Sequence, residues 1–362
     1  MPVQIEGAFA SCSHDSSAYV WTRYGDAWKP ELVFTRLRLA ALCLKWNPAG
    51  DTFAIGSSER LICICHRDKR NNCWAARLIR KCHSSSVTAV AWSPCGSFLA
   101  STSTDGRCML FSMGSRGAVE GDKSTFGTMM MDIEAGSGWG LGLSWSPSGE
   151  QLAITSHGST VHFVSGLHKA LASSTASELQ HGQHGQHGQL VRLEQPPLRC
   201  VEHLSETRLI GAGFDGEVYQ FERIPGGDWA QSGILSPTAA LSEASSQTGK
   251  LSAAFRDKLA LFKGHTSHDS SARGVREATT EQREAHHSNV IVDMHAFRSP
   301  DGTPTGKFST AGWDGRVLVW QIDLADTIKA VHRSTEAHAC RLICKSVSQG
   351  PSSRTVCSLR SL

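Results

Sequence analysis

Histidine, serine and aspartate side chains recur in this chain at positions from which they could act together in hydrolysis. His83 precedes an apolar segment and Asp105 closes a tight turn after it, while His286 or His287 stands in the same relation to Asp314. In a hydrolytic triad, the Asp orients the His, and the His removes the proton of a serine. No G-x-S-x-G elbow accompanies these residues, and they recur together with a longer repeat. A structural hydrogen-bond network is therefore the favoured interpretation.

The longer repeat is an acidic or polar turn residue, alternating apolar residues, and an aromatic or aliphatic residue six positions later. Its copies begin 43, 47, 52, 58 and 99 residues apart. A period of about 40–45 residues is typical of the WD-type β-propeller blade, a sheet that cannot bury its own faces alone. We therefore expect an all-β WD-repeat propeller, whose function comes from a rigid stacked platform and from what its loops carry. The six copies lie at residues 15–21, 58–64, 105–111, 157–163, 215–221 and 314–320.

In WD blades, a His and an Asp usually form a hydrogen-bond network that continues to a buried Trp. Phe111 occupies the Trp position of the unit that begins with His83, and a phenyl ring cannot donate a hydrogen bond. The last unit is more complete. The residues predicted for this structural network are His83, Asp105, Asp15, Trp21, His286, Asp314 and Trp320.

Three turns of the form W-[SN]-P-x-G support the same architecture, at residues 46–50, 92–96 and 145–149. Proline presets the first turn dihedral, and glycine tolerates a left-handed backbone, so each copy predicts a hairpin. One copy would be a weak signal, but three in corresponding places are specific.

Composition limits the other classes of function. The 362 residues are 40% hydrophobic, and 36 basic against 33 acidic residues leave a net charge of only +3, too balanced to indicate nucleic-acid binding. The N-terminus does not resemble a signal peptide, and no apolar stretch is long enough to span a bilayer, so we expect a cytoplasmic protein without membrane contact.

Twelve cysteines contain no C-x-x-C pair, and zinc sites usually show a closer pairing. We expect no metal, no cofactor and no catalytic residue, and we interpret the cysteines in apolar segments as reduced, small core residues. These are Cys43, Cys63, Cys65 and Cys108.

The gap of 99 residues before the last copy contains an insertion, at residues 236–288. Its first part is rich in Ser, Ala and Thr, and its last part is polar and charged. Between them, residues 251–263 carry apolar side chains at spacings of four, four and three, which predicts a short amphipathic helix between flexible arms. The stripe either packs back on a blade or docks on a partner. The predicted partner-binding residues are Leu251, Phe255, Arg256, Leu259 and Phe262.

Several segments outside the generic blade pattern carry a resemblance to one family. They include AYVW at residues 18–21, WKP at 28–30 in an expected loop, FGTMM at 126–130, IGAGFD at 210–215 and AGWDG at 311–315. Over about residues 9–323, the chain resembles the WD-repeat subunit 1 of the actin-related protein 2/3 complex. That family is seven-bladed, and its insertion carries a comparable A-R-x-x-F helix thought to reach toward actin. The resemblance therefore favours docking for residues 251–263, with Ala254, Phe255 and Arg256 as nearest counterparts.

The chain departs from this family in three places. The family's first blade and the opening strand of its second have no counterpart, so residues 7–13 are expected to form the second strand of a blade in a propeller at residues 1–323. The HGQHGQHGQ segment at residues 181–189 is expected to be a solvated loop rather than a metal site. Residues 324–362 lack strand alternation, and we expect a disordered tail.

The resemblance implies a non-catalytic scaffold that supports actin filament nucleation and branching. The implied partners are actin-related proteins 2 and 3, the other subunits of the complex, the actin filament and nucleation-promoting factors. The alternative is a generic WD-repeat adaptor that binds peptides on its top face in another assembly. A generic adaptor needs neither the WKP segment nor the insertion.

Overall fold

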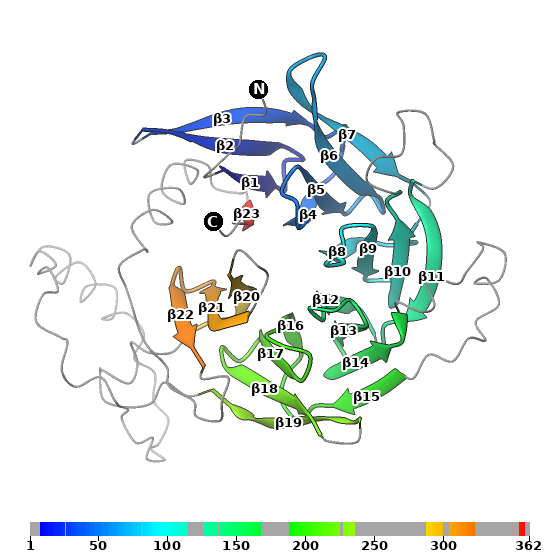
Figure 1. The fold of residues 1–362 in the computed structure, drawn as a ribbon, viewed down its shortest axis with the longest axis vertical. Coiled ribbons are helices and arrows are strands. Elements are labelled where there is room, and N and C mark those ends of the chain that lie inside the picture. The colour runs from blue at the N-terminus through cyan, green and yellow to red at the C-terminus, as the bar shows by residue number, and fades with distance from the viewer. Residues whose placement is uncertain are drawn as a thin grey trace, which may run out of the picture.

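The computed structural model describes residues 8–322 and 355–358, apart from residues 26, 81, 115–125, 137, 168–187, 225–226, 236–286 and 300–303. Its strands form six small antiparallel sheets placed around a centre (Figure 1). In each sheet, the strands follow chain order from the centre of the ring outward, apart from β23. Within the described residues, no helix is both long and apolar enough to cross a membrane.

The first two sheets are joined at their outer edges, where β3 and β7 pair in parallel through Val33 with Trp74 and Phe34 with Ala75. The first sheet contains β1 (Ala8–Ser13), β2 (Ala18–Tyr24), β3 (Ala27–Phe34) and the C-terminal β23 (Thr355–Ser358). The second contains β4 (Ala41–Trp46), β5 (Thr52–Ser57), β6 (Ile62–Asp68) and β7 (Cys73–Ile79).

The next three sheets have four strands each, and the sixth has three. The third contains β8 (Val87–Trp92), β9 (Phe98–Ser103), β10 (Arg107–Ser112) and β11 (Thr128–Glu134). The fourth contains β12 (Gly140–Trp145), β13 (Gln151–Ser156), β14 (Thr160–Ser165) and β15 (Gly188–Arg192). The fifth contains β16 (Leu198–His203), β17 (Arg208–Gly213), β18 (Val218–Arg223) and β19 (Trp229–Ile234). The sixth contains β20 (Ile291–Arg298), β21 (Pro304–Gly312) and β22 (Val317–Gln321).

The W-[SN]-P-x-G segments form the hairpins that the sequence predicts. In each, the glycine N–H donates to the carbonyl three residues earlier, over 2.8–2.9 Å, and the glycine φ lies between 69° and 76°. Such a backbone favours glycine, because a Cβ is rarely accommodated there. These turns fix the register between the inner strand and the second strand in the second, third and fourth sheets.

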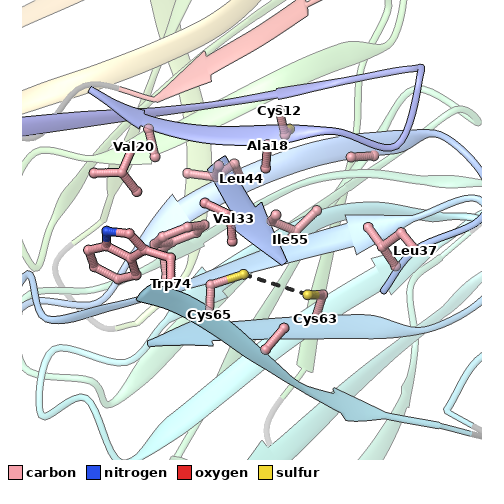
Figure 2. Close-up of a cluster of buried hydrophobic side chains, with 14 of the residues drawn as sticks. Cys12, Ala18, Val20, Val33, Leu37, Leu44, Ile55, Cys63, Cys65 and Trp74 are labelled. Carbon is pink, nitrogen blue, oxygen red and sulfur yellow. Dashed lines mark hydrogen bonds between the residues drawn. The ribbon is translucent and has the colours of Figure 1, made fainter. Parts of the chain in front are cut away.

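The core lies between neighbouring sheets, because alternate side chains of each strand face opposite neighbours. Five buried clusters join the first sheet to the second and so on to the sixth. Figure 2 shows the cluster of the first two sheets, in which the Sγ atoms of Cys63 and Cys65 lie 3.6 Å apart. Cys63, Cys65 and Cys108 are buried, as predicted, whereas Cys43 is half-buried.

The C-terminal tail differs from the sequence prediction, which gave it no strand. β23 pairs antiparallel with β1, placing Ser358 opposite Ala10 and Thr355 opposite Ser13. β1 therefore holds the second position of its sheet, as predicted, and the tail supplies the inner position. Backbone hydrogen bonds alone can hold such a strand, so side-chain alternation in the sequence is a poor guide to it.

The WKP segment also differs from expectation. It lies inside the outer strand β3, not in a loop, and Pro30 stands opposite Trp21 of β2. Proline is tolerated in an outer strand because one side of that strand needs no ladder hydrogen bond.

Candidate functional site

The sixth sheet contains a complete chain of buried hydrogen bonds. The Trp320 indole N–H donates to Thr310 Oγ1 over 2.9 Å, and Thr310 Oγ1 lies 2.8 Å from His287 Nε2. His287 Nδ1 lies 3.1 Å from both carboxylate oxygens of Asp314, which also accepts the backbone N–H of Ser288. Burial would raise the pKa of Asp314, but the N–H groups of Arg316 and Ser288 and the His287 ring outweigh it and hold the pKa below its usual range.

The third sheet contains a shorter version of this chain. His83 Nδ1 lies 3.0 Å from Asp105 Oδ2, and His83 Nε2 lies 2.8 Å from Ser101 Oγ. Phe111 occupies the place of Trp320, so the chain ends at the serine. Burial lowers the pKa of His83 and so favours the neutral imidazole, although the neighbouring Asp105 carboxylate acts in the opposite direction.

The first sheet contains only the other end of the chain. The Trp21 indole N–H donates to Ser11 Oγ over 2.9 Å, whereas the Asp15 carboxylate accepts the backbone and side-chain groups of Ser17. No His contacts Asp15 among the described residues. Across the three sheets, the hydroxyl lies four positions before the turn Asp and the aromatic ring six positions after it, which is why the repeat was visible in the sequence.

The sequence analysis considered His286 or His287 for the last unit and named His286 in the predicted network, and the structure corrects this to His287. The hydrogen bonds to Asp314 come from His287, and His286 lies outside the described residues. His287 lies directly before Ser288, just as His83 lies directly before Ser84, and each serine N–H bonds the turn Asp. This shared His–Ser order could have distinguished the two histidines.

The geometry of these networks is unsuitable for hydrolysis. The His83 and His287 side chains are 0% exposed, and so is Ser101, the hydroxyl that a triad would use as its nucleophile. A substrate carbonyl cannot reach a hydroxyl enclosed between packed sheets. Among the described residues, no group of His, Cys, Asp and Glu side chains is arranged to hold a metal ion. The networks instead tie the turn of a sheet to its inner strands.

The predicted partner-binding residues Leu251, Phe255, Arg256, Leu259 and Phe262 all lie outside the described residues. The described chain stops at Leu235, whose side chain is 1% exposed, and resumes at His287. The helix at residues 251–263 therefore stays a prediction. Its two attachment points belong to the fifth and sixth sheets.

The HGQ repeat is only partly described, because residues 181–187 lie outside the described part. Its last two residues differ from the expected solvated loop. Gly188 and Gln189 begin β15, and the Gln189 side chain exchanges two hydrogen bonds with the backbone N–H and carbonyl of Trp229. The end of the repeat thus links the outer strands of the fourth and fifth sheets.

Sequence analysis missed a group of exposed aromatic side chains on the turn side of the ring. Trp139, Phe214 and Trp313 are 55%, 39% and 50% exposed and come from the fourth, fifth and sixth sheets. The His157 ring lies between two of them, 5.3 Å from Trp139 and 6.4 Å from Phe214. Phe214 and Trp313 each precede a turn Asp directly, a position from which a side chain points out of the sheet. Exposed aromatic groups of this kind are characteristic of protein contact surfaces.

Sheets of four strands around a ring, with His–Asp networks between turn and inner strand, define a WD-repeat β-propeller. Residues 76–112, which include most of the third sheet, match the family model "WD domain, G-beta repeat". A chain in a solved structure of the mitotic checkpoint complex has a similar fold. It superimposes with a TM-score of 0.54 over 88% of this chain and 74% of that chain, at 14% identity.

The chain belongs to the family of actin-related protein 2/3 complex subunit 1. It is 34% identical over 319 residues to subunit 1A of Arabidopsis thaliana, covering 86% of this chain and 78% of the relative. Subunit 1A-B of Xenopus laevis is 32% identical over 328 residues, and subunit 1 of Saccharomyces cerevisiae is 27% identical over 330 residues. These alignments cover 86% and 88% of this chain, and 78% and 82% of the relatives.

Proposed function

We propose that this protein is a non-catalytic scaffold subunit of an actin-related protein 2/3 complex and that it supports actin filament nucleation and branching. The observation that carries the proposal is the similarity to subunit 1 over 319 residues and 86% of the chain, far more than a single blade contains. A generic WD repeat would be expected to match mainly in the strand and turn pattern.

The described surface is suited to a scaffold. The His and Ser side chains of the hydrogen-bond networks are buried within the sheets. Trp139, Phe214 and Trp313, from three different sheets, are exposed. Rigid aromatic side chains on a rigid ring lose little conformational entropy when a partner covers them. We assign this surface to contacts with actin-related proteins 2 and 3 and the other subunits, within the cytoplasmic actin cytoskeleton.

In this proposal, the insertion contacts the actin filament, and nucleation-promoting factors act on the assembled complex. The support is the apolar stripe of residues 251–263 together with the family resemblance of this segment. A helix with a single apolar face requires a groove to cover it.

The test is a replacement experiment. Complex assembled with this chain as its subunit 1 is compared, in actin assembly with a nucleation-promoting factor, with complex that lacks any subunit 1. We expect branch formation to require this chain. Equal branch formation without it would contradict the proposal.

A further inference from the structure

Positive charge is concentrated in and around the second sheet. Residues 36–81 contain ten basic and three acidic residues, a net charge of +7, whereas the whole chain has a net charge of only +3. Four of the basic residues are exposed arginines near the end of the sheet that carries the turn from β5 to β6: Arg36, Arg38, Arg60 and Arg80. In the described part of the chain, none of their guanidinium groups bonds a carboxylate. Their charge is therefore available to a partner.

Hydrogen bonds bring three separate segments together at this end of the sheet. The Arg38 N–H donates to Glu59 Oε2 over 3.0 Å, which ties the link between β3 and β4 to the turn between β5 and β6. The Cys82 thiol donates to the Arg60 carbonyl over 3.3 Å, which ties the same turn to the segment that follows β7. Arg80 stands two residues before Cys82. The four arginines therefore belong to one continuous surface.

Two large apolar side chains are exposed on the same surface. Val33, Thr35 and Leu37 are 2%, 6% and 8% exposed, whereas Phe34 and Leu39 are 56% and 53% exposed. Alternate side chains of an extended segment point to opposite sides, so the phenyl ring lies on the solvent side together with the arginines that follow it. We call this surface the basic rim, and its members are Phe34, Arg36, Arg38, Leu39, Arg60 and Arg80.

Two of these arginines occupy backbone positions that suit glycine. The φ of Arg60 is 66°, and the same turn position holds Gly106, Gly216 and Gly315 in the third, fifth and sixth sheets, with φ of 78°, 79° and 75°. The φ of Arg36 is 59°. A residue with a Cβ adopts such a backbone at a cost in stability. Arginine at both positions therefore indicates a role other than folding.

We propose that the basic rim binds the surface of an anionic membrane. Arginine side chains form paired hydrogen bonds with phosphate oxygens, so the four guanidinium groups lie at the level of the lipid headgroups. Phe34 and Leu39 enter the boundary between headgroups and acyl chains, as apolar side chains beside basic ones do in peripheral membrane proteins. The expectation of no membrane contact considered only a signal peptide and spanning segments, and peripheral binding needs neither.

The apolar members of the basic rim favour a membrane over an acidic protein. A bilayer accommodates single projecting side chains such as Phe34 and Leu39 without a matching pocket, whereas a protein partner must supply a complementary pocket for each. The rim also lies across the ring from the fifth sheet, which carries Phe214 (Figure 1). Subunit contacts at that side leave the second sheet uncovered, and the inference does not depend on which assembly contains the chain.

The test is vesicle flotation with the tagged full chain, purified in its native assembly. Vesicles of phosphatidylcholine with phosphatidylserine and phosphatidylinositol bisphosphate are compared with vesicles of phosphatidylcholine alone. We expect binding only to the anionic vesicles, and weaker binding as the salt concentration rises. Equal binding to both vesicles, or no binding to either, would overturn the proposal. Binding to inositol hexakisphosphate or polyglutamate without binding to vesicles would overturn it too, because the partner would then be a soluble anion or an acidic polypeptide.

A glycine double variant separates loss of binding from loss of folding. Arg36→Gly with Arg60→Gly removes two charges and gives both positions a residue that suits their backbone. We expect about 30-fold weaker binding to anionic vesicles, with a melting temperature that is not lowered. Lys69→Ala with Lys307→Ala removes the same charge from exposed positions outside the basic rim and should leave binding unchanged. Equal losses of binding in the two double variants would contradict the basic rim as the site.

A second double variant tests insertion of the apolar side chains. Phe34→Ser with Leu39→Ser keeps the charge of the basic rim, and both side chains are more than half exposed, so little packing is lost. We expect about tenfold weaker binding to anionic vesicles, because the apolar surface no longer leaves water. Unchanged binding of this variant would show that nothing enters the bilayer and would contradict a membrane as the partner.

Discussion

Lys45 Nζ lies 3.3 Å from Asp293 Oδ1, so a salt bridge joins β4 of the second sheet to β20 of the sixth. The two residues are 248 positions apart in the sequence and belong to the inner strands of the second and sixth sheets. Burial would lower the pKa of Lys45, but Asp293 and Glu202 outweigh it and hold the pKa above its usual value. This pair joins the second and sixth sheets, which share no buried apolar cluster among the described residues.

Lys45→Met should lower the free energy of unfolding by about 1 kcal/mol, because both side chains are about one-third exposed and solvent screens part of the attraction. A double-mutant cycle with Asp293→Asn, measured by urea denaturation, isolates the pair. Arg107 and Asp132 form a matched pair within one sheet. The sixth sheet should be cleaved faster by a protease after the loss of Lys45, but not after the loss of Arg107. Equal effects of the two changes would mean that Lys45 does not tie the sixth sheet to the second.

Trp320→Phe should lower the free energy of unfolding by about 1 kcal/mol more than the loss of buried apolar surface accounts for. The additional loss arises because the change removes the buried hydrogen bond to Thr310. Phe111→Trp is the reciprocal change. It places an indole N–H where Ser101 Oγ can accept it, so Phe111→Trp should lower the free energy of unfolding less than Trp320→Phe does. Thermal unfolding of both variants measures this. If Trp320→Phe leaves stability unchanged, the four-residue chain does not support the sixth sheet.

Trp92 and Trp46 are the same residue at the same place in neighbouring sheets, but they differ in whether the indole N–H has an acceptor. The Trp92 indole N–H donates to the Lys45 carbonyl over 3.0 Å, joining the third sheet to the second, as Trp145 joins the fourth to the third through Ala91. The buried Trp46 indole N–H has no acceptor among the described residues. Trp92→Phe should therefore destabilise by about 1 kcal/mol more than Trp46→Phe in denaturant unfolding. Equal losses would show that the junction hydrogen bond adds nothing to packing.

Acid should destabilise the ring through its buried histidines. Burial, with Arg298 nearby, lowers the pKa of His203 to about 3, and burial with Lys45 lowers that of His295 to about 4. In the unfolded chain both groups take up protons below about pH 6.5. The unfolded state therefore binds more protons between pH 6.5 and 4, and stability falls as pH falls through that window.

His203→Gln should flatten this fall by on the order of 1–2 kcal/mol between pH 7 and pH 5. The exposed His14→Gln is the control and should leave the slope unchanged. Melting temperatures across the pH range measure both. An unchanged slope in His203→Gln would show that the buried imidazole does not control the acid response.

The insertion can be tested within the assembled complex. Phe255→Ala with Phe262→Ala removes two aromatic groups of the predicted stripe, each worth about 2–3 kcal/mol when buried. We expect nearly unchanged thermal stability of the ring, together with weaker filament binding and branch formation. The off-stripe changes Asp257→Ala with Lys263→Ala are the matched control and should leave branching intact. A large drop in melting temperature with normal branching would place the stripe in the core instead.

The repeat was readable from the sequence because each sheet reuses one pattern of turn residue and alternating side chains. That periodicity predicted the propeller, the His83–Asp105 pair and the second-strand position of β1. It could not place β23, whose four residues pair through the backbone. The loop expected for WKP came from the family resemblance and not from the periodicity, and the segment lies in strand β3 instead. Tertiary context allows proline at an outer edge.

The candidate surfaces were harder to predict. Exposure of Trp139, Phe214 and Trp313 depends on how separate turns come together, and nothing local distinguishes them from the core tryptophans. The basic rim is hidden in the sequence for the same reason, since its four arginines come from three separate segments. Only the fold shows that they share one surface.

The central claim, that this chain is a subunit of an actin-related protein 2/3 complex, is tested most directly by its stoichiometric partners. The protein is tagged in its own cells, purified under native conditions and resolved by size, and the co-eluting polypeptides are quantified by mass spectrometry. We predict that actin-related proteins 2 and 3 and the smaller subunits elute with the chain in equal amounts. Recovery of cullin adaptors or histones with no actin-related protein would contradict the account.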